Sequence, residues 1–331
     1  MTTLTQPTVS IALCTYNGMA YLSTQWNSLL GQQQLPDEVV ISDDRSTDGT
    51  SNLLLKLAAE APFPVRILEN QTRLGYNKNF ERALAACTSD LIFICDQDDF
   101  WLPEKISTMT QYMVHHPEVQ VAFCDAWVTD EHLEGRQNRF WETVRFNKKT
   151  QERWIAGETM DVLLDGNRMM GCATVLRRAF LPTILPIPEK IPGYIYDGWI
   201  ALVASTQNAI HFINQPLQLY RTHVQQQVGV RQQEVGARIK LRDRLTRHRA
   251  RKLAPLLKKQ IQLSIINELL SKRVPYNSPG LPQLQRRLAH FSMRSNLPHN
   301  RLRRVAPVLT NFWRGNYRRY ADAAANWYAP C

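Results

Sequence analysis

The sequence predicts an α/β fold in which helices flank a mostly parallel sheet and a basic helical region follows. Short apolar segments alternate with helical segments of about 10–12 residues, which is the pattern of βαβ units. The charge also divides the chain. Residues 226–331 hold 22 Lys and Arg against 4 Asp and Glu (+18), and residues 1–225 hold 18 against 25 (−7), which together give the formal charge of +11. We therefore expect two units, residues 1–229 and 230–331.

The first hundred residues contain most of the expected sheet. Residues 91–95 are five apolar residues in a row, which is typical of a buried strand in a parallel sheet. Ser46, Thr47 or Asp48 can cap the helix that follows the second strand. The expected strands cover 9–14, 38–42, 65–69, 91–95 and, later, 210–220, and the expected helices cover 19–30, 51–60, 76–86 and a segment ending near 204.

Three carboxylates follow the strand at 91–95, namely Asp96, Asp98 and Asp99. No basic residue stands beside them in the sequence, so they would repel one another unless a cation lay between them. Carboxylate oxygens of this kind suit Mg²⁺ or Mn²⁺. The alternative is an acidic turn that closes a strand, where Asp is common.

Polar side chains also follow the first two strands. They are Thr15, Tyr16 and Asn17 after the first strand and Asp43 and Asp44 after the second. Because ligands of such sheets bind beyond the carboxyl ends of the strands, these clusters should converge on one site, which favours the metal interpretation. An acidic residue after the second strand can hydrogen-bond a base or a ribose. No G-x-G-x-x-G follows the first strand and no P-loop motif occurs, which argues against a dehydrogenase or a P-loop enzyme.

Together these motifs resemble the GT-A-fold glycosyltransferases of family two. The resemblance covers about residues 8–230 and is greatest to the bacterial rhamnosyltransferase-type branch, in which DQDD-x-W and a closing YR-x-H are habitual. Arg45 stands where a glycine is common, and Gly198 stands where that branch often has an aromatic residue. The matching segments are 9–17, 41–50, 70–80, 96–99, 171–178, 196–199 and 220–223.

The resemblance implies transfer of a sugar from a nucleoside diphosphate to an acceptor hydroxyl with inversion at the anomeric carbon. It implies that Asp98 holds a divalent cation, Mg²⁺ or Mn²⁺, and that Asp96 contacts the ribose or supports the metal. His223 would close over the diphosphate or complete the metal shell. Arg73 and Asn79 are expected to contact the nucleotide, together with the polar residues after the first two strands. Residues 166–172 would form a loop on the acceptor side.

Asp197 is the candidate catalytic base. It opens an apolar helix, where an Asp is commonly a simple cap. Its flanking motif, Tyr196 to Trp199, matches the resemblance, which favours the catalytic role. A single in-line displacement needs one carboxylate to accept the proton of the acceptor hydroxyl, and it needs no protein nucleophile.

The basic region is expected to form amphipathic helices at 251–273, around Leu284, Leu288 and Phe291, and over 301–328. Aromatic residues beside arginines fit a helix that lies in the interface of an anionic membrane. The alternative is a helical cap on the sheet unit. The predicted apolar stripe of the first helix is Leu253, Leu256, Leu257, Ile261, Ile265, Leu269 and Leu270. That of the last segment is Val305, Val308, Leu309, Phe312, Trp313, Tyr317, Tyr320, Trp327 and Tyr328.

Other features of the chain predict a cytoplasmic protein on the inner face of the cytoplasmic membrane. There is no apolar run of about 18 residues and no secretory signal in residues 1–8. Six scattered cysteines without a CxxC pair fit a reducing compartment and argue against a disulfide framework or a zinc site.

The expected partners are a nucleotide-sugar donor and a growing bacterial surface glycan on a lipid carrier. The rhamnosyl-type motifs favour dTDP-rhamnose, with a UDP-sugar as the alternative. Nucleic-acid binding by the basic region is a competing function, but the Asp cluster would repel a phosphate backbone and no nucleic-acid motif is present. A sugar-phosphate nucleotidylyltransferase would need a glycine-rich basic loop after the first strand, where this chain has Thr15 to Gly18.

Overall fold

The computed structural model describes residues 6–136, 138–224, 226, 249–300 and 302–320. Within them the strands form one sheet of eight strands in the order β3-β2-β1-β4-β7-β6-β8-β5. The strands are β1 (Val9–Thr15), β2 (Glu38–Asp43), β3 (Val65–Glu69), β4 (Leu91–Cys95), β5 (Phe100–Trp101), β6 (Val121–Thr129), β7 (Thr174–Arg177) and β8 (Ile210–Arg221).

The sheet is mostly parallel, as predicted. Strands β3, β2, β1 and β4 pair in parallel, and so do β6 and β8. Strand β7 runs antiparallel to both of its neighbours, and the short β5 runs antiparallel to β8. Every residue of β1 and β4 is buried, which explains their unbroken apolar sequences. The carboxyl ends of β1, β2, β4 and β8 therefore meet at one edge of the sheet.

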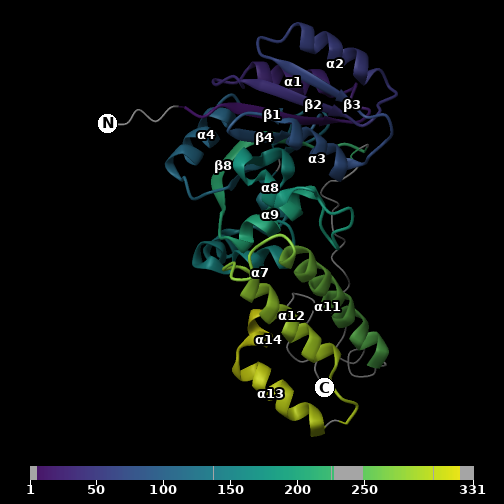
Figure 1. The fold of residues 1–331 in the computed structure, drawn as a ribbon, viewed down its shortest axis with the longest axis vertical. Coiled ribbons are helices and arrows are strands. Elements are labelled where there is room, and N and C mark those ends of the chain that lie inside the picture. The colour runs from purple at the N-terminus through teal and green to yellow at the C-terminus, as the bar shows by residue number, and fades with distance from the viewer. Residues whose placement is uncertain (1–5, 137, 225, 227–248, 301, 321–331) are drawn as a thin grey trace.

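Four helices cover the sheet in its N-terminal half (Figure 1). They are α1 (Leu22–Leu30), α2 (Thr50–Ala59), α3 (Tyr76–Ala86) and α4 (Lys105–His115). Helix α1 starts three residues later than predicted, because a turn precedes it in which the Gly18 carbonyl accepts from the Tyr21 and Leu22 amides at 3.0 Å. Helix α2 begins after Gly49, and Asp48 accepts hydrogen bonds from the Thr50 amide and hydroxyl.

A second group of helices lies below the sheet in Figure 1. The helix α9 (Tyr196–Thr206) is buried along its whole length and leads into β8. Around it are α5 (Phe140–Thr143), α6 (Lys148–Arg153), a π-helical turn (Trp154–Glu158), α7 (Thr159–Leu164) and α8 (Leu181–Ile184), with 3₁₀ turns at Gly171–Ala173 and Arg178–Phe180.

The helices α11 (Arg249–Ser271) and α12 (Leu281–Ser295) pack against each other and join the same hydrophobic core. The predicted stripe of α11 is partly wrong. Leu257, Ile261 and Ile265 are 41%, 58% and 37% exposed, whereas the predicted Leu256, Leu269 and Leu270 contact the core together with Leu263 and Ile266, which were not predicted. Helix α11 has apolar residues on more than one side, so their spacing in the sequence could not show which side would be buried. On α12, Leu284 and Phe291 are buried as expected.

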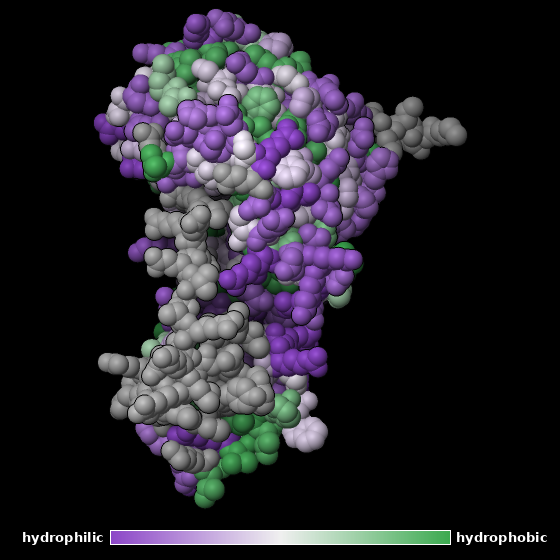
Figure 2. Space-filling model, turned by 180° about the vertical axis from the view of Figure 1, so that it is seen from behind, coloured by the Kyte–Doolittle hydropathy of each residue, from purple (hydrophilic) through white to green (hydrophobic). Residues whose placement is uncertain are grey.

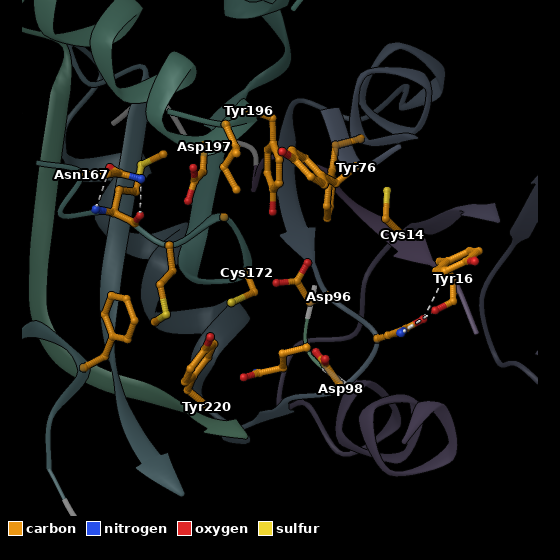
Figure 3. A pocket seen from close by; sticks show the side chains of 18 of the residues that line it. Cys14, Tyr16, Tyr76, Asp96, Asp98, Asn167, Cys172, Tyr196, Asp197 and Tyr220 are labelled. Atoms are coloured by element: carbon orange, nitrogen blue, oxygen red, sulfur yellow. Dashed lines mark hydrogen bonds between the residues drawn. The ribbon is translucent and has the colours of Figure 1, made fainter. Parts of the chain in front are cut away.

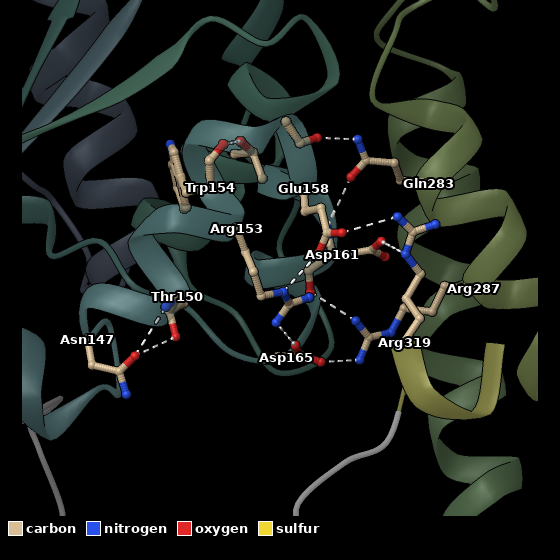
Figure 4. A network of polar contacts seen from close by, with 12 residues as sticks. Asn147, Thr150, Arg153, Trp154, Glu158, Asp161, Asp165, Gln283, Arg287 and Arg319 are labelled. Atoms are coloured by element: carbon tan, nitrogen blue, oxygen red, sulfur yellow. Dashed lines mark hydrogen bonds and ion pairs between the residues drawn. The ribbon is translucent and has the colours of Figure 1, made fainter. Parts of the chain in front are cut away.

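A polar network fixes α12 and the C-terminal turn to α7 (Figure 4). The buried Arg287 donates to the Asp161 carbonyl at 2.9 Å and pairs with the Asp165 carboxylate. Arg319 pairs with Glu158 at 3.2 Å and with Asp161 at 3.7 Å. Helix α12 and the C-terminal turn are therefore held against α7 and the residues beside it.

The last described segment is not one amphipathic stripe. It consists of a 3₁₀ turn (Leu302–Arg304), α13 (Val305–Trp313) and α14 (Asn316–Arg319), separated by Gly315 at φ +70°. Tyr317 and Tyr320 are buried, whereas Leu309, Phe312 and Trp313 are 48%, 58% and 83% exposed. Hydrophobic residues accordingly gather at the end of the molecule where Figure 1 places α13 (Figure 2).

The predicted boundary at 229/230, together with Trp327 and Tyr328, lies outside the described residues. Among the helices that are described, none combines the length and the apolar character needed to cross a bilayer.

Candidate active site

A cavity of about 2100 Å³ lies beyond the carboxyl ends of β1, β4 and β8. Of the eleven residues predicted to form the site, ten line this cavity, and Asp43 does not. The ten are Thr15, Tyr16, Asn17, Asp44, Arg73, Asn79, Asp96, Asp98, Asp197 and His223. Figure 3 shows Asp96 and Asp197 pointing into the same space from opposite sides, with Cys172 and Asp98 near Asp96.

The carboxylates after β4 crowd one another. Burial and the charges of Asp98 and Asp99 raise the pKa of Asp96 well above its usual range. Burial and the Asp98 charge raise the pKa of Asp99 to about 7. The Asp98 Oδ2 lies 2.9 Å from the Nε2 of His223, which comes from the end of β8, 125 residues further along the chain. The two predicted metal ligands are therefore adjacent.

Lys105 and Arg221 partly neutralise this cluster, which corrects the expectation that the carboxylates have no basic neighbour. The Lys105 ammonium is buried 3.6 Å above the Trp101 ring and donates to the Cys172 carbonyl at 2.6 Å. Its charge opposes the rise in the pKa of Asp99. The Arg221 amide donates to Asp99 Oδ1 at 3.2 Å, and its Nε donates to the Asp98 carbonyl at 2.7 Å. Arg221 thus supports the acidic loop and does not line the cavity.

Gln97 joins the loops after β1 and β4. Its side-chain oxygen accepts from the Tyr16 amide at 2.8 Å, and its side-chain nitrogen donates to the Tyr16 carbonyl at 3.0 Å. A Cβ on Gly18 would lie 2.2 Å from the Gln97 oxygen, so a glycine is needed there. The sequence analysis did not predict a role for Gln97, although its position between Asp96 and Asp98 was a signal.

Asp43 and Asp44 differ in their surroundings. Asp43 is buried and accepts hydrogen bonds from the Thr15 hydroxyl at 2.6 Å and from the Ser46 amide at 2.9 Å, so it shapes the loop behind the cavity. Asp44 faces the cavity and accepts from the Leu74 amide at 2.6 Å and the Gly75 amide at 2.9 Å.

Two further predicted residues have identifiable local partners. The Asn79 side chain donates to the Ser42 carbonyl at 3.0 Å and accepts from Asn70 at 2.9 Å, so it ties α3 to β2. The Arg73 guanidinium carbon lies 3.9 Å from the centre of the Tyr16 ring, and both side chains line the cavity.

The candidate base, Asp197, sits in the first turn of α9 and is buried. Burial raises the pKa of Asp197 to about 7, against the opposing hydrogen bonds from Gly198, Gly171 and Asn167. The Gly198 amide is 2.5 Å from Asp197 Oδ1. A carboxylate with this pKa can take up a proton near neutral pH.

Both departures from the family pattern have local explanations. Arg45 adopts φ +63°, the left-handed conformation that a glycine adopts most easily. A Cβ on Gly198 would lie 2.6 Å from the Tyr194 ring, so a larger residue there would displace this ring. The Tyr194 hydroxyl is held at 2.6 Å from the Leu163 carbonyl.

The cavity continues along the loop at 166–172, which the sequence assigned to the acceptor side. This end is lined by Arg145, Asp165, Asn167 and Arg168. Asp165 also pairs with Arg287 of α12, so α12 contacts the rim of the cavity.

The donor set fits a hard divalent cation. Asp96 and Asp98 supply carboxylate oxygens, and His223 supplies an imidazole whose Nδ1 is buried without a hydrogen-bond partner among the described residues. Asp96, Asp99 and Cys172 also lie within 4.8 Å of one another. Burial raises the pKa of the Cys172 thiol, which makes it a poor ligand for such an ion.

The chain has relatives among bacterial proteins. It is 27% identical over 217 residues to the uncharacterized protein Rv1520 of Mycobacterium tuberculosis, covering 65% of this chain and 59% of that protein. It is 26% identical over 231 residues to the dTDP-rhamnosyl transferase RfbG of Shigella flexneri, covering 66% and 73% of the two chains. The match thus spans about 59% of the mycobacterial relative's length.

The fold is similar to that of the mannosyltransferase PcManGT from Pyrobaculum calidifontis, solved with GDP-Man and Mn²⁺. The TM-score is 0.52 at 15% identity, over 99% of this chain and 86% of that one. This likeness confirms the predicted GT-A-type fold. The sequence also matches Glycosyl transferase family 2 over residues 10–176, which is 167 of the 331 residues. The chain therefore belongs to glycosyltransferase family 2.

Proposed function

We propose that this protein is an inverting glycosyltransferase that moves a sugar from a nucleoside diphosphate to an acceptor hydroxyl. One observation carries the proposal: Asp197, whose pKa is about 7, faces the Asp96–Asp98 cluster across one cavity. This arrangement supplies a base on one side of the sugar and an anchor for the diphosphate on the other.

In the proposed step, the acceptor oxygen attacks the anomeric carbon from the side of Asp197. The new C–O bond forms as the bond from carbon to the diphosphate oxygen breaks, and the diphosphate leaves with that electron pair. The proton of the hydroxyl passes to the Asp197 carboxylate. Because attack is in line, the anomeric configuration inverts and no covalent enzyme intermediate is needed.

Asp98 and His223, with Asp96 beside them, would hold Mg²⁺ or Mn²⁺. When bound, this cation would stabilise the negative charge that develops on the leaving diphosphate. Asp96 would otherwise contact the ribose of the donor. The mannosyltransferase of similar fold was solved with Mn²⁺, which supports a divalent ion here.

For the donor we propose dTDP-rhamnose, with a UDP-sugar as the alternative. The rhamnosyl-type motifs and the similarity to a dTDP-rhamnosyl transferase support it. Asp44 would read the base, because thymine and uracil both offer an N3–H to a carboxylate. Its Oδ1 already accepts from the Leu74 amide and the Asn70 side chain, so the base would bind Oδ2, which accepts from the Gly75 amide and can accept a second hydrogen bond. Tyr16 and Arg73, stacked on each other at the cavity rim, would contact the nucleotide.

For the acceptor we propose a hydroxyl of a growing surface glycan on a lipid carrier. Such an acceptor lies in the inner leaflet of the cytoplasmic membrane, so the enzyme would work in the cytoplasm at that surface. The exposed apolar side of α13, with Arg303, Arg304 and Arg314 in and beside that helix, supports docking on anionic lipid.

Competition between nucleotides tests the donor. With Mg²⁺ or Mn²⁺ present, dTDP should raise the thermal midpoint more than UDP, and dTDP-rhamnose should be consumed when acceptor is supplied. A clear preference for UDP would overturn the rhamnose assignment and leave the glycosyltransferase proposal standing. Binding of neither nucleotide at any metal concentration would overturn both.

A further inference from the structure

A second group of metal-ligating side chains lies away from the cavity, where α4 ends and β8 begins. His116 and Glu118 belong to the turn after α4, and His211 is the second residue of β8. One ligand atom from each of the three lies within 4.8 Å of the other two. None of the three lines the glycosyl-transfer cavity.

The His211 ring is oriented by a hydrogen-bond partner on its Nδ1. Its Nδ1 lies 3.0 Å from the Tyr112 hydroxyl of α4. When Nδ1 donates its proton to this hydroxyl, Nε2 keeps its lone pair and can bind a metal. A hydrogen bond of this kind on the non-ligating nitrogen is the usual support of a metal-binding histidine.

Hydrogen bonds hold the backbone of the turn that carries His116 and Glu118. Arg177 of β7 donates from Nε to the Val119 carbonyl at 2.7 Å and from Nη2 to the His116 carbonyl at 3.2 Å. The Val121 amide donates to the Ala209 carbonyl at 3.0 Å, which ties the end of the turn to the start of β8. Because this backbone is already held in place, its side chains lose little conformational freedom when a metal binds.

This cluster lies at the amino ends of β6 and β8, whereas the cavity lies beyond the carboxyl ends. His211 and Arg221 mark the two ends of β8, ten residues apart, or roughly 30 Å along an extended strand. The two places are therefore independent.

We propose that His116, Glu118 and His211 bind a divalent transition metal ion of the Zn²⁺ type. The bound ion would link the end of α4 to the start of β8. Two imidazole nitrogens and one carboxylate oxygen suit Zn²⁺, with water in the fourth position, and do not suit Mg²⁺. Cysteine spacing carried no sign of such a site, because its ligands are histidine and glutamate.

Titration of the tag-free full-length chain with ZnCl₂ tests the proposal by calorimetry. The Asp98→Asn background weakens metal binding in the cavity, so that the remaining isotherm reports the second site. We expect one equivalent of Zn²⁺ in this background, no competition from Mg²⁺, and a rise of a few degrees in the thermal midpoint. His211→Ala should weaken Zn²⁺ binding by more than about tenfold, and Tyr112→Phe by about tenfold.

Glu118→Gln provides a second variant that keeps the fold, because this side chain is 61% exposed, and it should also weaken Zn²⁺ binding. His115→Ala is the matched control, since this exposed neighbour points its Nδ1 at the Gln111 carbonyl at 2.7 Å, and it should bind Zn²⁺ like the parent. The proposal is wrong if His211→Ala and Glu118→Gln bind as tightly as the parent, if His115→Ala loses as much affinity, or if Asp98→Asn alone abolishes Zn²⁺ binding.

Discussion

At the scale of single residues, burial decides what each carboxylate can do. Asp197 and Asp99 both have pKa values raised to about 7, but their neighbours differ. Asp99 accepts hydrogen bonds from the Arg221 amide and the Gln218 side chain, so it is committed to the loop. Asp197 lines the cavity, where a substrate hydroxyl can reach it. Residue type alone would not separate these two roles.

Asp197→Asn should therefore remove the base and keep the donor site. We expect kcat to fall on the order of 10²–10⁴-fold with donor affinity nearly unchanged. In the parent, kcat should rise as the pH rises through about 7, because only the deprotonated carboxylate accepts the proton, and this rise should vanish in the variant. Steady-state kinetics between pH 5.5 and pH 8.5, an estimated window around that pKa, measure both effects. A loss confined to donor affinity would remove Asp197 from the catalytic role.

Asp98→Asn tests the proposed metal site. It should abolish metal-dependent nucleotide binding and turnover, because Asp98 is the carboxylate that lies against His223 at 2.9 Å. Calorimetry with dTDP in the presence and absence of Mn²⁺ measures the coupling, and circular dichroism checks the fold. Glu142→Gln, an exposed carboxylate change outside the cavity, should behave like the parent. Turnover at the parent rate without added metal would refute the assignment.

At the scale of elements, local pattern predicted the parallel half of the sheet well. Strands β1, β2, β3 and β4 lie within a residue of their expected positions, because each is a short apolar segment bounded by turn residues. The antiparallel β7 was not predicted, since four residues that pair with distant strands carry no local signature.

The parts of the site that escaped prediction depend on contacts between remote segments. The Lys105 charge opposes the rise in the pKa of Asp99, and Arg221 holds the acidic loop in place through the Asp98 carbonyl. Only the packed structure distinguishes Asp43, which faces the loop, from Asp44, which faces the cavity. Part of the buried face of α11 was missed for the same reason, because spacing alone did not show that Leu263 and Ile266 are buried and that Ile261 and Ile265 are exposed.

The contact between α12 and α7 gives a prediction at this scale. Arg287→Ala should lower the free energy of unfolding by on the order of 3 kcal/mol, because it removes the buried guanidinium from the Asp161 carbonyl and leaves Asp165 with Arg153 at 3.5 Å as its remaining described cation. Urea unfolding measures the change. Arg286→Ala, one residue away and exposed, is the control and should stay within about 0.5 kcal/mol of the parent. Equal effects of the two variants would show that the network in Figure 4 adds little stability.

At the scale of the whole molecule, the sheet and the basic C-terminal helices lie in different places. The sheet occupies one end of the long axis, and α13 lies at the other (Figure 1). From residue 269 to residue 321 there is no Asp or Glu, while this stretch contains eleven Lys and Arg. Because Asp165 joins α12 to the cavity rim, a surface that held the C-terminal helices would also fix the orientation of the cavity.

Binding to lipid vesicles tests the proposed membrane role of α13. A truncation at residue 230 would strip Leu263 and Ile266 from the core, so point variants are the better choice. Leu309→Ser with Trp313→Ser should reduce cosedimentation with anionic vesicles severalfold, while Ile155→Ser, equally apolar in type and 75% exposed, should not. Binding should rise with the fraction of anionic lipid and fall with salt, because screening shortens the reach of the arginines to about 3 Å near 1 M. If the α13 variants pellet like the parent, or if the parent does not pellet at low salt, the exposed side of α13 has another partner and the enzyme reaches its acceptor without this contact.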